Sequence, residues 1–481
     1  MKICVLGLSG ASHEILFSDE RLTNIRRLMD LGLYGPLESV FPPTPVPAWM
    51  CMTTSQDPGS LGVYGLRSKT DHVYHNSAAP SPASFHAPAL WDAVASQGKK
   101  SILVGVPPNC PPRAVDGISV GCFLTPDTSQ HEFTYPASLG EQVTKLVGEY
   151  PIDVKRAPDG PSDALVEEIV NMNRKQWDVV RWLIAGQPWD YFHFVDIGLD
   201  RVQHAFWTCF DPQNAQFQQG NPYHQVIPDY YQYLDEQIGT VLEMIDDQTI
   251  VLLLSEYGAQ LLDGVFAVNE WLVKEGLLVL NEQPLSPTIL DQLNVNWEKT
   301  KAWAEGYADI FFNVIGREPQ GIVPADELEL LQQDIQQRLD ALTDQNGEPL
   351  RLRLHKPGEF YSKVTNLAPD LTIHSDANWS FTDSVGYGVH LLTSDATSGA
   401  CGHSRQGIFV LFAPNNPLSG EFQGARLLDM APTLLDLAGY EIPESMQGKS
   451  LVAGMEKKSG SGLSESDEKL IHDRLAGLGY V

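Results

Sequence analysis

The chain has 481 residues, enough by length for two or three domains or for one large domain with an insertion. Hydrophobic residues make up 43% of it and charged residues 19%, a globular composition that excludes a largely disordered protein. The formal net charge of -29 opposes nonspecific binding to nucleic acids and anionic membranes, so an anionic substrate would need a local positive field, most simply a metal ion.

The six cysteines are scattered and form no C-x-x-C pair, which favours reduced thiols over a disulfide framework or a zinc finger. The N-terminus passes directly into a short apolar segment, and no later apolar run reaches membrane-spanning length. We therefore expect a cytoplasmic protein without a membrane partner. The acidity and the lack of a basic run also argue against a nucleic-acid partner. The oligomeric state does not follow from the sequence.

Short apolar segments alternate with amphipathic segments through most of the chain. The apolar runs predict strands at residues 3–6, 101–104, 191–195, 249–254, 370–373 and 408–412. The amphipathic runs predict helices at residues 22–31, 90–97, 163–185, 230–245, 326–342 and after Arg426. The alternation predicts an α/β fold with a doubly wound, mostly parallel central sheet flanked by helices.

Four segments follow from this pattern. Residues 1–280 are predicted to form the first part of the core, 281–355 a smaller inserted cap, 356–455 the second part of the core, and 456–481 a linker with a C-terminal helix near Ser464. Within the first part, residues 41–49 are rich in proline and are expected to become helical only after Pro47. Residues 67–88 are polar and are expected to form a surface loop.

Asp200 and His204 follow the apolar run at residues 191–195. On a helix they would lie one turn apart on the same face, where a carboxylate and an imidazole can bind one divalent cation. For the pair alone, an ordinary Asp–His contact within a helix is the simpler interpretation. His403 lies in a predicted turn ahead of a strand. It would complete a three-ligand site if this turn and the carboxyl ends of the strands converge on one crevice. Three protein ligands with an open position are typical of a catalytic zinc.

At this point the sequence resembles a known family. Asp200-Arg-Val-Gln-His204 is similar to the D-R-x-Q-H segment of the type I phosphodiesterase/nucleotide pyrophosphatase branch of the alkaline phosphatase superfamily. Further similar segments lie at residues 106–112, 121–126, 313–323, 402–407 and 429–433, so the resemblance covers most of the chain. It implies a large parallel sheet and two zinc-type metals bridged by a Thr or Ser nucleophile that attacks a phosphodiester. For this chain it implies one metal bound by Asp200, His204 and His403.

The positions of the second metal and of the nucleophile depart from the family pattern. Ser9 stands where the family has an Asp, and Glu256-Tyr257 stands where it has Asp-His. A neutral phenol substitutes poorly for imidazole because it ionises only near pH ~10. The usual nucleophile position is occupied by Pro45. Thr44, next to it, could serve as the nucleophile if the chain is shifted by one residue, although a turn-forming role in a Pro-rich loop explains it equally well.

Two functions remain open. In the first, the protein is a hydrolase of a small phosphate ester with one divalent ion, expected to be zinc. The ion would lower the pKa of a bound water toward ~7, and Thr44 or that water would attack, with Glu256 as a candidate base. In the second, it is a non-catalytic member of the family, a pseudoenzyme that serves binding or assembly. Pro45 favours the second function, and the intact set of three ligands favours metal binding.

Overall fold

The computed structural model describes residues 1–453 apart from 155–159, 376, 394–400 and 415–417. The helix predicted near Ser464 lies outside the described residues. In the described part, a ten-stranded sheet runs in the order β20-β2-β19-β9-β1-β8-β5-β6-β7, with β21 beside β2. The five strands β9, β1, β8, β5 and β6 are mutually parallel, and β19 is antiparallel to β9. The strands are β1 (Ile3–Leu8), β2 (Leu33–Glu38), β5 (Ser101–Val104), β6 (Gly117–Val120), β7 (Thr134–Tyr135), β8 (Tyr191–Asp196), β9 (Ile250–Ser255), β19 (Gln406–Phe412), β20 (Gly420–Glu421) and β21 (Ala425–Arg426).

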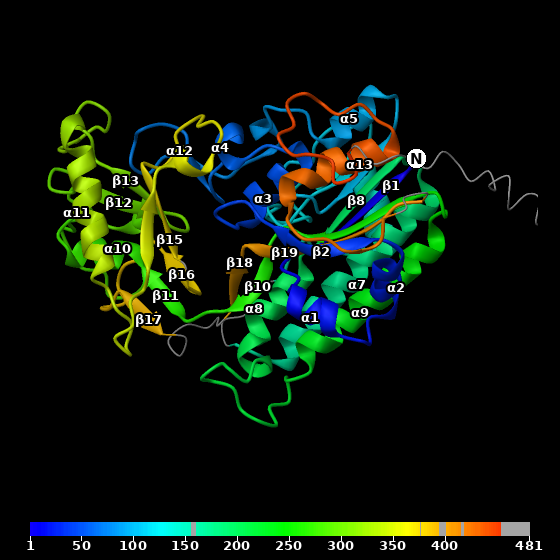
Figure 1. Ribbon diagram of the computed structural model, residues 1–481, viewed down its shortest axis with the longest axis horizontal. Helices are drawn as coiled ribbons and strands as arrows, with labels where there is room; N and C mark the ends of the chain where they lie inside the picture. The colour runs from blue at the N-terminus through cyan, green and yellow to red at the C-terminus, as the bar shows by residue number, and fades with distance from the viewer. Residues whose placement is uncertain (155–159, 376, 394–400, 415–417, 454–481) are drawn as a thin grey trace, which may run out of the picture.

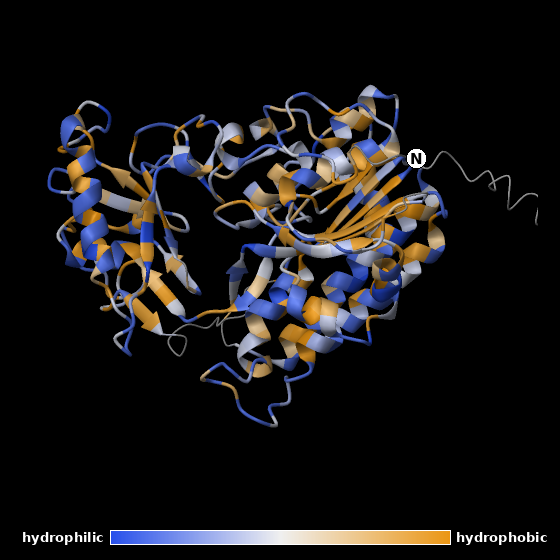
Figure 2. Cartoon of the chain, viewed as in Figure 1, coloured by the Kyte–Doolittle hydropathy of each residue, from blue (hydrophilic) through white to orange (hydrophobic). Residues whose placement is uncertain are grey.

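Helices cover both faces of this sheet, and the inner strands are apolar because both of their faces are buried (Figure 1; Figure 2). Along β1, Cys4, Leu6 and Leu8 face one hydrophobic cluster, whereas Ile3 and Val5 face the other. The first cluster is covered by α1 (His13–Ser18), α2 (Thr23–Leu31), α6 (Leu139–Val147), α7 (Asp163–Gly186), α8 (Gly198–Phe210) and α9 (Val226–Met244). The second is covered by α3 (Pro45–Thr54), α4 (Pro58–Leu61), α5 (Leu90–Ser96) and α13 (Met430–Ala438).

The predicted fold class is confirmed. None of the described helices is both long and apolar enough to span a bilayer.

A second unit, the cap, lies beside the core and has its own hydrophobic cluster (Figure 1). Its two sheets have the orders β12-β13-β15-β14 and β16-β11-β17. The elements are β11 (Gly264–Ala267), α10 (Val268–Lys274), β12 (Ala302–Glu305), β13 (Asp309–Phe312), α11 (Leu328–Asp340), β14 (Leu352–His355), α12 (Pro357–Phe360), β15 (Leu371–Ser375), β16 (Trp379–Thr382) and β17 (Leu391–Thr393). The buried cluster of the cap includes Phe266 and Val385 and so extends beyond the range 281–355. The strand predicted at 370–373 was expected in the core, but it is β15 of the cap.

The main chain passes between core and cap along a two-stranded ribbon. Strand β10 (Gly258–Leu261) leads toward β11 of the cap, and β18 (Cys401–Ser404) leads back to β19 of the core. The two strands are antiparallel, with Ala259 opposite His403. A turn was expected at residues 402–405, and this expectation was wrong because the pairing with β10 holds the segment extended.

Two local expectations about the N-terminal half were also wrong. Helix α3 begins at Pro45 and not after Pro47, because the first turn of a helix needs no N–H donors and so tolerates proline. The segment at residues 67–88 is more than a surface loop, since it contains β3 (Ser68–Lys69), β4 (Ser77–Ala78) and the 3-10 turn at Pro82–Ser84. Lys69 and Tyr74 from this segment are buried.

Candidate active site

The candidate site lies at the carboxyl ends of the central parallel strands, where α/β sheets bind their ligands. Ser9 follows β1, Asp200 lies in the first turn of α8 after β8, and Glu256 and Tyr257 follow β9. The ribbon brings in His403, because Gly258 at the start of β10 pairs with Ser404 and also forms a bridge to Gly10. Residues far apart in the sequence therefore meet at one edge of the sheet.

The structure brings Asp200, His204 and His403 together. The Nε2 atoms of His403 and His204 lie 3.3 Å and 3.5 Å from Oδ1 of Asp200. The two Nε2 atoms are 3.1 Å apart. One ligand atom from each residue fits within 4.8 Å of the others, a spacing that a single metal ion can bridge. Asp200 and His204 lie one helical turn apart on α8, as their spacing predicts.

The neighbours of these three residues fix their orientation. His403 Nδ1 lies 3.0 Å from the carbonyl oxygen of Pro43, so Nδ1 donates to it and Nε2 faces Asp200 and His204. Arg201 donates to Oδ2 of Asp200 at 2.8 Å. Burial alone would raise the pKa of Asp200, but His204, His403 and Arg201 outweigh burial and hold this pKa well below its usual range. The site therefore offers one ionised carboxylate and two imidazoles.

The second cluster, formed by Ser9, Glu256 and Tyr257, does not fit a second metal ion. The hydroxyl of Ser9 donates to Glu256 at 2.5 Å and lies 3.3 Å from the Tyr257 hydroxyl. All three residues are fully buried. Burial raises the pKa of Glu256 to about 8, against the opposing effect of the hydrogen bond from Ser9. At neutral pH the cluster thus presents two hydroxyls and a largely protonated carboxyl, and it lacks the negative charge that a second cation needs.

Thr44 lies at the N-terminus of α3, yet its hydroxyl makes no capping hydrogen bond. A capping hydroxyl would accept from the N–H group of the second or third helical residue, and the third, Pro47, has no N–H group. The Thr44 side chain is buried, and its Oγ1 has no partner among the described residues. The adjacent carbonyl of Pro43 is the one bound to His403, which ties this loop to the three ligands.

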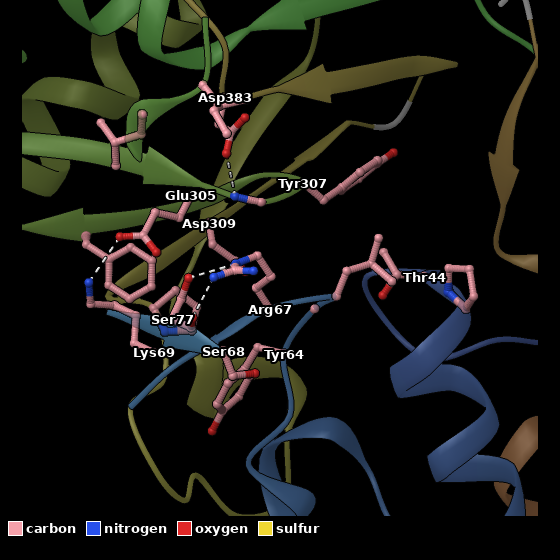
Figure 3. Close-up of a pocket in the computed structure, with 18 of the residues that line it drawn as sticks. Thr44, Tyr64, Arg67, Ser68, Lys69, Ser77, Glu305, Tyr307, Asp309 and Asp383 are labelled. Atoms are coloured by element: carbon pink, nitrogen blue, oxygen red, sulfur yellow. Dashed lines mark hydrogen bonds and ion pairs between the residues drawn. The ribbon is translucent and has the colours of Figure 1, made fainter. Parts of the chain in front are cut away.

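A cavity of about 490 Å³ lies between core and cap and joins these groups. From the core it is lined by Thr44, His204 and His403, and from the cap by residues that include Tyr307 and Asp309 (Figure 3). This volume lies within the range of small-molecule sites. No sequence pattern pointed to the cap residues, because they reach the cavity only through the packing of a separate unit.

Two basic residues of the segment at 67–78 line the cavity and differ in their pairing (Figure 3). Lys69 is buried and donates to Glu305 at 3.0 Å and to the carbonyls of Val73 and Tyr74, so its three N–H groups are all used. Arg67 donates only to the hydroxyl and the carbonyl of Ser77. Among the described residues no carboxylate pairs with Arg67, so its positive charge remains open to a ligand.

Asp309 predicts a pH dependence of stability. Burial raises its pKa to about 7, with an opposing hydrogen bond from Thr372 and a reinforcing effect of Glu305. Between pH 4 and pH 7 the folded protein holds a proton that the unfolded chain releases, so the free energy of unfolding falls as pH rises through this window. The free energy of unfolding should therefore decrease from pH 5 to pH 8, and we expect this decrease to be smaller by roughly 2–3 kcal/mol in Asp309→Asn than in the unsubstituted protein. Urea unfolding at both pH values measures this difference, and Asp116→Asn, at an exposed carboxyl, is the control. Equal pH dependence in all three proteins would contradict the expectation.

Comparisons with known proteins give one family and several solved structures of similar fold. The model of the family described as type I phosphodiesterase/nucleotide pyrophosphatase matches residues 3–403. The structure of human ectonucleotide pyrophosphatase/phosphodiesterase 5 is similar with a TM-score of 0.55 at 11% identity, over 92% of this chain and 96% of that one. An inactive murine form of that protein in complex with AMP gives 0.54 at 12% identity, over 92% and 96%. Phosphonoacetate hydrolase from Sinorhizobium meliloti 1021, in complex with phosphonoformate, gives 0.57 at 12% identity, over 91% and 95%. No curated protein matches the sequence.

Proposed function

Because the chain belongs to the type I phosphodiesterase/nucleotide pyrophosphatase family, we propose that it hydrolyses a small phosphate ester with one divalent metal ion, for which zinc is the expected choice. The observation that supports this proposal is that Asp200, His204 and His403 converge within 4.8 Å beside the cavity that also holds Thr44. The resemblance inferred from the D-R-x-Q-H segment is confirmed at the level of the family. The activity, the ion and the residue roles are proposals.

The three ligands would hold the ion through one carboxylate oxygen and two imidazole nitrogens, the donor set of a zinc site with an open position. A bound ion there supplies Lewis acidity toward a phosphoryl oxygen. The carbonyl of Pro43 fixes the tautomer of His403, and Arg201 fixes the orientation of Asp200. These two contacts use Nδ1 of His403 and Oδ2 of Asp200, so Nε2 of His403 and Oδ1 of Asp200 remain directed toward each other.

Thr44 is the proposed nucleophile, since its hydroxyl has no partner among the described residues and the residue lines the cavity with two of the three ligands. The Thr44 oxygen forms a bond to phosphorus, the ester P–O bond breaks, and the departing alcohol takes the proton that the Thr44 hydroxyl gives up. Water then attacks the phosphorus, the bond between phosphorus and the Thr44 oxygen breaks, and a proton from the water restores the Thr44 hydroxyl. Glu256 is not the base in this proposal. It is fully buried and bonded to Ser9, and its pKa is raised to about 8, so at neutral pH it is largely protonated and cannot accept a proton.

The alternative function is that of a non-catalytic family member, and two features favour it. Pro45 stands where the family has its nucleophile, and the Ser9–Glu256–Tyr257 cluster does not fit a second ion. One assay separates the two functions. Pure protein loaded with zinc is incubated with bis(4-nitrophenyl) phosphate and with nucleotide esters, the latter because a murine protein of similar fold is seen with AMP. Cleavage that a chelator stops and added zinc restores supports the hydrolase. Absence of both bound metal and cleavage supports the alternative.

Arg67 is proposed to bind negative charge on the substrate, because it lines the cavity and its guanidinium has no carboxylate partner among the described residues. We expect Arg67→Gln to raise KM about tenfold, the size of one charge-assisted hydrogen bond, with a smaller change in kcat. Steady-state kinetics measure this split. Arg174→Gln is the matched control, since it removes the same charge from an exposed position on α7. An unchanged KM in Arg67→Gln would show that the guanidinium does not contact the substrate.

A further inference from the structure

Tyr257 is fully buried and touches two of the three proposed metal ligands from behind. Its ring stacks on the imidazole of His403, with a centroid distance of 3.9 Å and an interplanar angle of 18°. Its hydroxyl donates to Oδ1 of Asp200 at 3.2 Å. Oδ1 is also the oxygen closest to the two imidazole nitrogens. One side chain thus contacts both the carboxylate and one of the imidazoles.

Tyr257 is itself held rigidly in place. Its carbonyl accepts a hydrogen bond from the Ser255 hydroxyl at 2.6 Å, and that hydroxyl in turn accepts from the backbone N–H of Ala11. The next residue, Gly258, starts the pairing of the ribbon and forms the bridge to Gly10. At the other end of the side chain, the Ser9 hydroxyl lies 3.3 Å from the Tyr257 hydroxyl. The phenol therefore has little freedom to move away from Asp200 and His403.

We propose that Tyr257 is a positioning residue that holds Asp200 and His403 ready for one metal ion, while its cluster with Ser9 and Glu256 fills the protein interior that a second ion would need. This inference rests on the proposed function of the three ligands. Partners that orient metal ligands typically contribute 10- to 100-fold in metal affinity. Tyr257 acts through the ligands and not on the substrate, so its first effect is on metal affinity and ligand geometry.

The test compares zinc binding by four proteins: unsubstituted, Tyr257→Phe, Tyr257→Leu and Tyr231→Phe. Tyr257→Phe keeps the stacked ring and removes the hydroxyl, whereas Tyr257→Leu removes both contacts. Tyr231 is the matched control, because it is a buried tyrosine whose hydroxyl bonds Gln203 and the backbone of Ser12 and is not hydrogen-bonded to the three ligands. Competition with a chelator gives the zinc dissociation constant. Unfolding of the metal-free proteins reports any general loss of stability.

We expect one zinc per chain in the unsubstituted protein, about tenfold weaker binding in Tyr257→Phe, and up to about 100-fold weaker binding in Tyr257→Leu. Tyr231→Phe should bind zinc as the unsubstituted protein does. Replacing zinc by cobalt adds a spectroscopic readout, since the visible bands of cobalt follow ligand geometry and should shift in the Tyr257 variants alone. A merely structural role would lower stability without moving these bands.

The outcomes separate the two levels of the proposal. If the unsubstituted protein binds no zinc, the proposed function of the three ligands fails. If it binds zinc and Tyr257→Phe binds equally well with the same cobalt spectrum, the positioning role is overturned while metal binding stands. Binding of two zinc ions per chain would show that the cluster of Ser9, Glu256 and Tyr257 does not exclude a second ion. If Tyr257→Phe does not fold, Tyr257→Leu takes its place, because it removes both contacts with the ligands, and an unchanged zinc affinity there overturns the positioning role.

Discussion

Replacing His204 with alanine is expected to weaken zinc binding by more than about 100-fold, beyond the usual effect of losing a partner that only orients a ligand. The variant keeps Asp200 and His403, which lie 3.3 Å apart, but two ligands do not complete a catalytic zinc site. Because the proposed activity depends on the zinc ion, the rate of hydrolysis of an activated phosphodiester should fall to background in this variant. Elemental analysis of the purified protein and release of 4-nitrophenol measure the two effects.

His131 provides the control for this substitution. It is an exposed histidine in a turn, bonded to the carbonyl of Asp127, and it does not line the cavity. His131→Ala should leave metal content and activity unchanged. A His204→Ala protein that retains one bound zinc and full activity would rule out His204 as a ligand, and with it the proposed site.

Replacing Thr44 with valine is expected to lower kcat about 10²- to 10⁴-fold with little change in zinc affinity. Valine keeps the shape of threonine, so α3 and the Pro43 carbonyl that binds His403 should remain in place. The substitution removes only the hydroxyl that is proposed to attack phosphorus, and losing an interaction made in the chemical step lowers kcat. Thr44→Ser should keep part of the activity, because a primary hydroxyl can also attack.

The same pair of variants decides between the two proposed attacking groups. If a metal-bound water attacks directly, Thr44→Val and Thr44→Ser should both remain active. If Thr44 attacks, the serine variant alone should be active, and a covalent phosphoryl group on Thr44 should be detectable by mass spectrometry after rapid acid quench. Full activity of Thr44→Val would remove Thr44 from the mechanism.

The core strands were predictable because each is a short apolar run between polar segments. The runs at residues 3–6, 101–104, 191–195, 249–254 and 408–412 correspond to β1, β5, β8, β9 and β19. The convergence of Asp200 and His204 followed from their helical spacing after β8. The expected start of this helix after Pro47 was wrong, because the first turn of a helix tolerates proline and α3 begins at Pro45.

The cavity and the role of Tyr257 could not be read from the sequence, because both depend on contacts between distant segments. Lys69 and Glu305 both line the cavity and pair, although they are separated by 236 positions in the chain. Tyr257 could be judged from its chemistry only as a poor replacement for imidazole. Its stacking on His403 depends on the pairing of β10 with β18, and nothing in either segment's composition specifies that partner.

The ribbon of β10 and β18 has a mechanical consequence. His403 sits on one of the two chain crossings that join cap and core, whereas Asp200 and His204 belong to α8, which is anchored in the core. An ion bound by all three residues would link β18 to α8 and so restrict movement of the cap relative to the core. Because such coupling is reciprocal, any contact that favours the approach of the cap to the core would also raise the affinity for the ion. Binding of the ion and approach of the cap would then be coupled steps of one equilibrium.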